Sequence, residues 1–404
     1  MSLFPTVPWL RNQYVMAATV FVVFTGFAFV LPFLPLYVRE LGVADDEQAA
    51  LWAGVLIGVS PLLAGLLAPV WGRLADRYGQ KPMALRALGS YVVLQLLSAL
   101  VTNVGQLFAL RVGVGLFGGI GPLGLAMATS LAPREQTGRV VGLVQSAQIL
   151  SAAVGPLAGG LLADTIGIRL TFAVTAVLCA LPLALVARYY VEGPRQTHEV
   201  EPAPPSFRAI LRTSQVPSLL VVLFLVNFIG RSLTPILPAY LKGLGVSPTR
   251  LASATGVLIS AYSVAAVVSA TLLGRASRRR RPRALLIASL VGGAVTVLPM
   301  AFAPSYAAVL ALAILLGLAS GGSLTLCYTL GGLMVPQDRR TTAFGFFAGA
   351  ALLGGAVSPS VAGLLAHWDL KGIFYLDAAL YVALAAGLSL QAAAATPLRT
   401  EDPS

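Results

Sequence analysis

The stretch WGRLADRYGQKP, residues 71–82, is a short polar segment between two long apolar ones. Three basic residues and one acid lie within nine positions of it, although only 10% of the chain is charged. This concentration of charge, interrupted by glycine and proline, indicates a tight turn between two helices. The residues that define the turn are Gly72, Arg73, Asp76, Arg77, Gly79, Lys81 and Pro82.

The composition of the chain indicates whether water or lipid surrounds it. Of 404 residues, 57% are hydrophobic, and the mean hydropathy is +0.85. A soluble domain carries about 25% charged residues to cover its surface. This chain has too few, so lipid must cover it, and we expect a membrane protein. The net charge of +12 lies in the connections between apolar segments. It therefore reflects membrane topology rather than a nucleic-acid partner.

Apolar segments long enough to cross a bilayer recur along the chain. A helix needs about 20 apolar residues to cross about 30 Å of hydrocarbon. The breaks predict an all-α membrane protein with 12 transmembrane helices and both termini cytoplasmic. In that orientation, twenty of the 27 basic residues lie on the cytoplasmic side and five outside, as the positive-inside rule requires. The predicted spans are 14–38, 50–72, 84–102, 107–127, 139–163, 169–189, 217–241, 252–274, 284–303, 306–328, 341–365 and 371–395.

The two halves of the chain resemble each other. LPFLPLYVRELGV (31–43) matches TPILPAYLKGLGV (234–246), and LSAAVGPLAGGLLAD (150–164) matches LGGAVSPSVAGLLAH (353–367), both at an offset of 203 residues. Two matches at one offset predict two six-helix bundles related by a pseudo-two-fold repeat, with a substrate site between them at the midplane. The predicted units are an N-terminal bundle (1–189), a cytoplasmic linker (190–216) and a C-terminal bundle (217–404).

Three motifs make the chain resemble the major facilitator superfamily. The turn at 71–82 is similar to the signature of that family between spans 2 and 3, and RVGVGLFGG (111–119) is similar to its span 4 motif. SAAVGPLAGG (151–160) is similar to the span 5 motif of the 12-helix drug/proton antiporters. The likeness covers the whole chain, because the span count, the linker and all three motifs are in register. The matching residues are Gly72, Leu74, Asp76, Arg77, Gly79, Lys81, Arg111, Gly115, Gly155, Pro156, Gly159 and Gly160.

The resemblance implies conformational roles for two of these motifs. Asp76 would hold an outward-open state by contacting the inner end of span 11, which follows PQDRRTT (336–342). The alternative is a turn that only anchors the topology. Because proline lacks a backbone donor, Pro156 predicts a break and a kink in span 5. The small residues beside it permit close packing, so a gating hinge and a packing role both stay open.

Polar side chains inside the predicted spans mark a candidate substrate cavity or proton relay. An arginine in the bilayer costs about 2.5–3.5 kcal/mol on insertion scales, so Arg111 and Arg231 are functional candidates. Snorkelling to the headgroups is the alternative for Arg111. Asp377 is the only acid inside any predicted span; the other candidate proton carriers are Asp76 and Glu40. Two arginines without a facing acid favour neutral or anionic substrates. Further candidates are Gln145, Gln148, Asn227, Tyr262, Phe346 and Phe347.

The span 5 motif favours an exporter of small amphiphilic drugs or toxic compounds in a prokaryotic plasma (inner) membrane. It would work by alternating access, driven by the proton gradient without a cofactor or a metal. The alternative on the same fold is a proton-coupled importer or a facilitator of a small organic anion. An enzyme is not expected, because GVGLFG (113–118) lies inside a span and the histidines form no cluster. Expected partners are a small-molecule substrate, protons and membrane lipids, and we expect a monomer.

Overall fold

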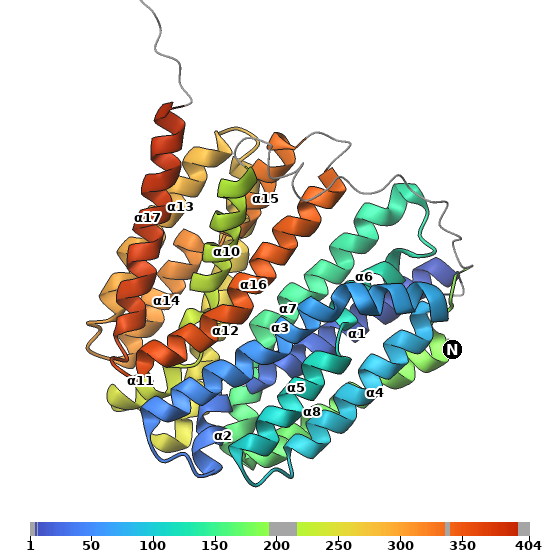
Figure 1. The fold of residues 1–404 in the computed structure, drawn as a ribbon, viewed down its shortest axis with the longest axis horizontal. Coiled ribbons are helices and arrows are strands. Elements are labelled where there is room, and N and C mark those ends of the chain that lie inside the picture. Colours follow the sequence, from blue (N-terminus) through green and yellow to red (C-terminus); the bar gives the residue numbers. More distant parts are fainter. Residues whose placement is uncertain (1–4, 6, 194–215, 336–339, 395–404) are drawn as a thin grey trace, which may run out of the picture.

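The computed structural model describes residues 5, 7–193, 216–335 and 340–394, and within them every regular element is a helix (Figure 1). The elements are α1 (Pro8–Val30), α2 (Leu34–Glu40), α3 (Asp46–Tyr78), α4 (Gln80–Ser98), α5 (Val104–Phe117), α6 (Ile120–Thr129), η1 (Arg134–Gln136), α7 (Thr137–Ile166), α8 (Ile168–Tyr189), α10 (Val216–Ser232), α11 (Leu237–Gly243), η2 (Pro248–Arg250), α12 (Leu251–Ala276), α13 (Pro282–Met300), α14 (Tyr306–Ser320), α15 (Ser323–Met334), α16 (Arg340–Ala366) and α17 (Gly372–Ala394).

Each predicted span corresponds to one helix or to two consecutive helices. The pairs α1–α2 and α10–α11 occupy equivalent places in the two halves, and the second pair is bent by 45°. Span 4 is divided into α5 and α6 at Gly118–Gly119, where Gly119 has a φ of 109° that suits glycine. Nine helices of the described part are long and apolar enough to cross a membrane, or ten with α10–α11. Neither α4 nor α5–α6 is among them, so twelve crossings stays a prediction.

The predicted break in span 5 is wrong. α7 is one continuous helix from Thr137 to Ile166 with Pro156 inside it. A proline in a transmembrane helix costs one backbone hydrogen bond, and neighbouring helices can compensate for this loss. Beside the proline, the Leu157 amide donates a hydrogen bond to Ser260 of α12.

The hydrophobic cores lie within the halves. One cluster joins buried residues from Val216 to Leu388, and two others join residues between Val15 and Tyr190. Ala50 belongs to the first of these, while Ala252 belongs to a cluster of the N-terminal half, so the halves also share apolar contacts. Most of the predicted linker, residues 194–215, lies outside the described residues, and the bundle boundaries stay predictions.

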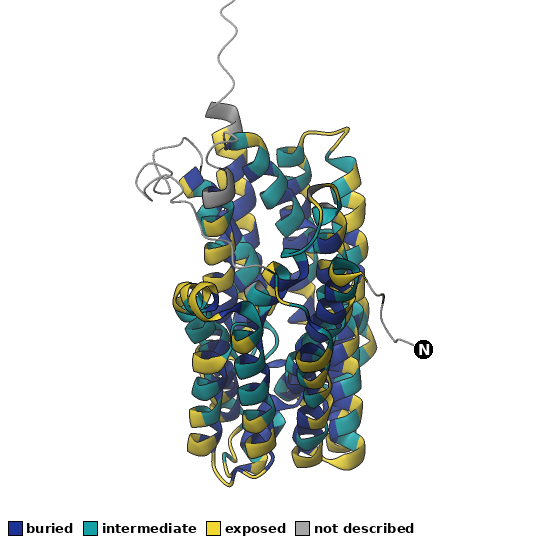
Figure 2. Cartoon of the chain, turned by 90° about the vertical axis from the view of Figure 1, so that its right-hand side faces the viewer, coloured by how far each residue is buried: buried dark blue, intermediate teal, exposed yellow. Residues whose placement is uncertain are grey.

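Two antiparallel helix crossings join the halves, α3 with α16 and α7 with α12. We call the side of the bundle where α8 ends and the linker begins the linker side, and the other the opposite side. Figure 1 shows the four helices at the centre, between the N-terminal helices in blue and green and the C-terminal helices in yellow to red. Burial along α3 falls from the opposite side to the linker side: Ala53 is fully buried, whereas Leu66 is 62% exposed. Buried and exposed positions alternate along the helices in the side view (Figure 2).

Candidate functional site

The span 5 motif uses two faces of α7. Side chains added at Gly155 and Gly159 would overlap α1 of the same half, at Ala28 and Phe29. The neighbouring residue on the other face, Pro156, places its carbonyl against Gly256 of α12. The motif therefore packs α7 against its own bundle and against the other half at the same time, which explains its small residues.

Gly160 lets the α7 backbone come into direct contact with the backbone of α12 in the other half. A side chain added at Gly160 would overlap the carbonyl of Ala252 on α12. Ser260 adds a polar contact there, because its hydroxyl accepts a hydrogen bond from the Leu157 amide at 3.0 Å. All these contacts lie in the half of α7 nearer the opposite side.

The α3–α16 crossing repeats this arrangement. A side chain at Gly54 would overlap the carbonyl of Pro359, and one at Gly363 would lie 2.6 Å from the Ala50 carbonyl. Pro359 and Gly363 follow Pro156 and Gly160 at the 203-residue offset of the repeat. Ser358 takes the place of Gly155 and donates a hydrogen bond to the Phe228 carbonyl at 2.5 Å. The glycine spacing that brings the halves together is thus present twice.

The two crossings end differently. At the end of α7, the carboxylate of Asp164 accepts hydrogen bonds from the backbone amides of Ala252 (3.3 Å) and Ser253 (2.7 Å), at the N-terminus of α12 in the other half. Among the described residues of its own half, no side chain caps α12. An acid at a helix N-terminus satisfies free amides and interacts favourably with the helix dipole.

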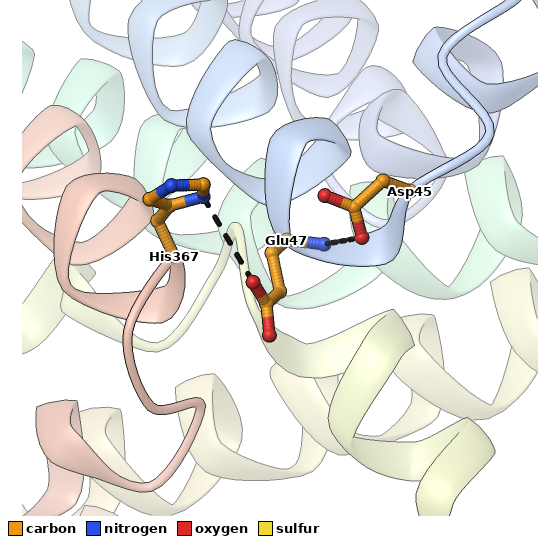
Figure 3. A group of neighbouring side chains, drawn as sticks. All are labelled: Asp45, Glu47 and His367. Atoms are coloured by element: carbon orange, nitrogen blue, oxygen red, sulfur yellow. Dashed lines mark hydrogen bonds and ion pairs between the residues drawn. The ribbon is translucent and has the colours of Figure 1, made fainter.

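The equivalent position on α16 is His367. Figure 3 shows His367 beside Glu47 at the start of α3, with Nδ1 3.9 Å from the Glu47 carboxylate. They form an ion pair when the histidine is protonated. The N-terminus of α3 already has a cap, because Asp45 accepts from the Glu47 and Gln48 amides. Lys242 of the C-terminal half also binds Asp46 at 2.7 Å, and Arg39 binds the same carboxylate.

On the linker side, the turn at 71–82 contacts its own half. Lys81 receives two of these contacts: its amide donates to Glu192 at 3.3 Å and its ammonium to the Tyr190 carbonyl at 3.0 Å. Gly79 has a φ of 104°, and a side chain there would collide with Glu192. Arg77 lies over the ring of Tyr78. The turn therefore holds the end of α8 and the first residues after it.

Asp76 is exposed and pairs with no described residue. The segment that the family resemblance implies as its partner, 336–342, lies outside the residues whose side chains are described. A side chain at Gly72 would meet nothing within 4 Å. The gating role of this motif therefore stays a prediction.

Arg111 is buried inside the N-terminal half. It lies two turns into α5, its guanidinium is 5.8 Å from the centroid of the Phe172 ring, and its exposed fraction is 6%. Among the described residues no acid pairs with it, and its Nε and Nη2 atoms lack hydrogen-bond partners. The buried hydroxyl of Tyr91 on α4 and the amide of Gln95 also lack partners there. These unpaired groups form a polar region inside the first bundle.

The candidates around Arg231 are brought together only in part. Arg231 is exposed near the end of α10, and its side chain runs past Gly355 of α16 toward Tyr262 of α12. Asn227 instead turns back to the Leu223 carbonyl of its own helix, at 3.2 Å. Phe346 packs against the core of the C-terminal bundle. Gln145 is exposed and Gln148 half-buried on α7, where neither amide hydrogen-bonds a described side chain.

Asp377 is fully buried in α17. Its Oδ2 atom accepts a hydrogen bond from the Ser232 hydroxyl of α10 at 2.5 Å, and its Oδ1 atom has no partner among the described residues. Tyr262 and Tyr381 lie close enough to interact electrostatically with Asp377, and Ser320 lies beside these two tyrosines. Ser232 was not predicted, because it lies 145 residues away in the sequence and has no distinguishing pattern of its own. Asp164 could have been found, since it ends the repeated stretch that His367 ends in the second half.

Comparison with known proteins places these features in a family. A sequence model of the Major Facilitator Superfamily matches residues 16–258 and 251–403. Multidrug resistance protein MdtG of Enterobacter lignolyticus is 32% identical over 400 residues, which cover 98% of this chain and 96% of that protein. The protein of the same name from Dickeya zeae is 35% identical over 80% of each chain.

Solved structures share the fold. A bacterial homolog of the human lysosomal transporter Spinster, in an inward-facing and unoccupied conformation, superposes with a TM-score of 0.76 at 17% identity, over 94% of this chain and 96% of that one. The nucleoside transporter NupG superposes with a TM-score of 0.74 at 13% identity, over 93% of this chain and 99% of that one. At these identities the likeness concerns the arrangement of helices alone.

Proposed function

Because the chain belongs to the Major Facilitator Superfamily, we propose that it exports small amphiphilic drugs or toxic compounds in exchange for protons. It is a multi-pass transporter of the inner (plasma) membrane. The observation that carries the proposal is the likeness, over nearly the whole chain, to proteins named for multidrug resistance. The span 5 motif, with its two packed faces, supports the same assignment.

The linker side is cytoplasmic in this proposal. The five basic residues on the opposite side, among them Arg39 and Lys242, are few compared with the twenty assigned to the linker side. The described contacts between the halves are concentrated toward the opposite side, at Gly54, Gly160 and Gly363. From this distribution we infer an inward-facing state, in which the substrate site would open to the cytoplasm. Rocking about the two crossings would expose the same site to the outside.

The charge of Arg231 bears on the class of substrate. Arg231 is accessible near the two crossings, and no acid among the described residues pairs with it. A cationic side chain that lines a substrate site disfavours cations and accommodates neutral or anionic compounds. The same feature would suit an importer of a small organic anion, which is the alternative function.

The test is an accumulation assay in an efflux-deficient bacterium that expresses the chain. The three compounds are chloramphenicol (neutral), ethidium (cationic) and fusidate (anionic), each measured with and without a protonophore and against the empty vector. We expect expression to lower the accumulation of chloramphenicol or fusidate, and the protonophore to restore it. Increased accumulation on expression would establish import instead. Export of ethidium alone would overturn the argument from Arg231.

A further inference from the structure

The carboxyl group of Asp377 stands apart from every other acid of the described chain. It lies within a predicted span, and its side chain is fully buried. No basic residue of the described part forms an ion pair with it. An ionised carboxylate without a partner is costly inside a protein and costlier within a membrane. Binding a proton removes this charge and so stabilises a carboxyl group in such a position.

The partner of Asp377 can serve both of its protonation states. The Ser232 oxygen lies within hydrogen-bond distance of two acceptors, Asp377 Oδ2 at 2.5 Å and the Ile229 carbonyl at 2.9 Å. A hydroxyl has one proton to donate and also accepts. When Asp377 is ionised, Ser232 donates to it. When Asp377 carries a proton, that proton is donated to Ser232, and the hydroxyl turns to Ile229. Neither state loses the contact between the two side chains.

The groups around Asp377 connect it to an accessible position. Tyr262 of α12 lies close enough for electrostatic interaction with both Asp377 and Arg231. Arg231 is exposed and Tyr262 half-buried, whereas Asp377 is fully buried. Among the described residues, the titratable or charged groups that face Asp377 are Tyr262, Tyr381 of its own helix and, through Tyr262, Arg231. Ser320 of α14, which is uncharged, lies beside Tyr262 and Tyr381.

We propose that Asp377, with Ser232 as its hydrogen-bond partner, is the proton-binding site of the C-terminal half, reached from the exposed Arg231 by way of Tyr262. This proposal deepens the proposed exchange of drug for protons and rests on it for its role in transport. The proton itself is the ligand, so its binding can be tested without knowing the drug.

The first experiment measures a conformational equilibrium against pH. Spin labels at Arg139 of α7 and at Arg278, two residues after the end of α12, both exposed on the linker side, report the separation of the halves in the purified full chain. Both native cysteines are buried and will compete little for the label. We expect the ratio of the two states to change by about fivefold or more between about pH 5.5 and pH 8.5. In D377N the change should fall below about 1.5-fold, while E135Q, which alters an exposed acid, should behave like the unchanged chain.

Two further variants separate proton binding from structure. D377E keeps the carboxyl group and should restore most of the pH response. S232A removes a hydrogen bond that is stronger to the ionised carboxylate than to the protonated carboxyl group, so the midpoint of the response should move to higher pH rather than disappear. Loss of the response in D377E as well, or a response in D377N equal to that of the unchanged chain, would overturn the proposal.

The second experiment separates this proposal from drug export. Proteoliposomes are loaded with chloramphenicol, ethidium or fusidate, and transport driven by a pH gradient is compared with exchange at equal pH. D377N should lower the driven transport about tenfold or more and leave exchange within about twofold. If the unchanged chain transports none of the three compounds but keeps the Asp377-dependent pH response, drug export fails and the proton site stands. Driven transport that persists in D377N removes the proton site and leaves export intact.

Discussion

The α7–α12 and α3–α16 crossings have the same glycine spacing and different end residues. In both, glycine and proline let backbone meet backbone, at Gly160 with Ala252 and at Gly363 with Ala50. At their ends, Asp164 caps the α12 helix of the other half, whereas His367 lies beside Glu47. Both copies of the repeat therefore keep the small residues that close approach requires, whereas the charged contact at the end of each crossing differs. Close packing is the shared condition for closure on the opposite side, and the end charges adjust its strength.

The largest effect should come from adding a side chain at the equivalent glycine of each crossing. G160A and G363A each place a methyl group against a backbone carbonyl that cannot move aside. We expect each change to lower transport about tenfold or more and to separate the halves on the opposite side, because overpacking of this kind costs about 1–3 kcal/mol. Transport of the exported compound and the distance between labels on the opposite side are the measurements.

The controls for this prediction lie on the same two helices. Side chains at Gly142 of α7 and Gly349 of α16 would meet nothing within 4 Å. G142A and G349A should therefore leave transport within about 1.5-fold, since alanine favours a helix more than glycine does. If G160A lowered transport and G363A did not, the close packing of the two crossings would not be equivalent.

An intermediate effect is expected from removing the Asp164 cap at the end of the α7–α12 crossing. D164A removes the cap of α12, and loss of a helix cap costs about 1 kcal/mol. The population closed on the opposite side should fall about fivefold relative to the open one. The matched control is N103A, which removes the side-chain cap of α5 within one half. It should lower the melting temperature without changing the ratio of the two states. Equal effects of D164A and N103A on that ratio would contradict the role assigned to Asp164.

The smallest effect is expected from removing the His367 side chain at the end of the α3–α16 crossing. His367 and Glu47 are both 46% exposed and 3.9 Å apart, and exposed ion pairs contribute at most about 1 kcal/mol. H367A should change the ratio of the two states less than about twofold. A double-mutant cycle with E47Q measures the pair directly. A coupling as large as the effect of D164A would show that both ends hold the halves together equally.

The sequence predicted the helices more completely than the contacts between them. Hydropathy located every apolar segment, and the repeat of 150–164 in 353–367 indicated where the halves correspond. The break at Gly119 was missed because it depends on a local φ angle rather than on polarity. The continuity of α7 was missed because a proline by itself does not end a membrane helix. Ser232 could not be assigned to Asp377, since serine is common in membrane helices and its role depends on its neighbour across the bundle.

The cap on α12 is supplied by the other half of the molecule, and this has a consequence for local stability. When the halves separate on the opposite side, Asp164 withdraws, and the amides of Ala252 and Ser253 lose the acceptors that now protect them. The first turn of α12 should then fray, because no described side chain of its own half caps it. Each transport cycle would melt and rebuild one helical turn. Hydrogen–deuterium exchange at these two amides would follow the cycle in an unlabelled chain.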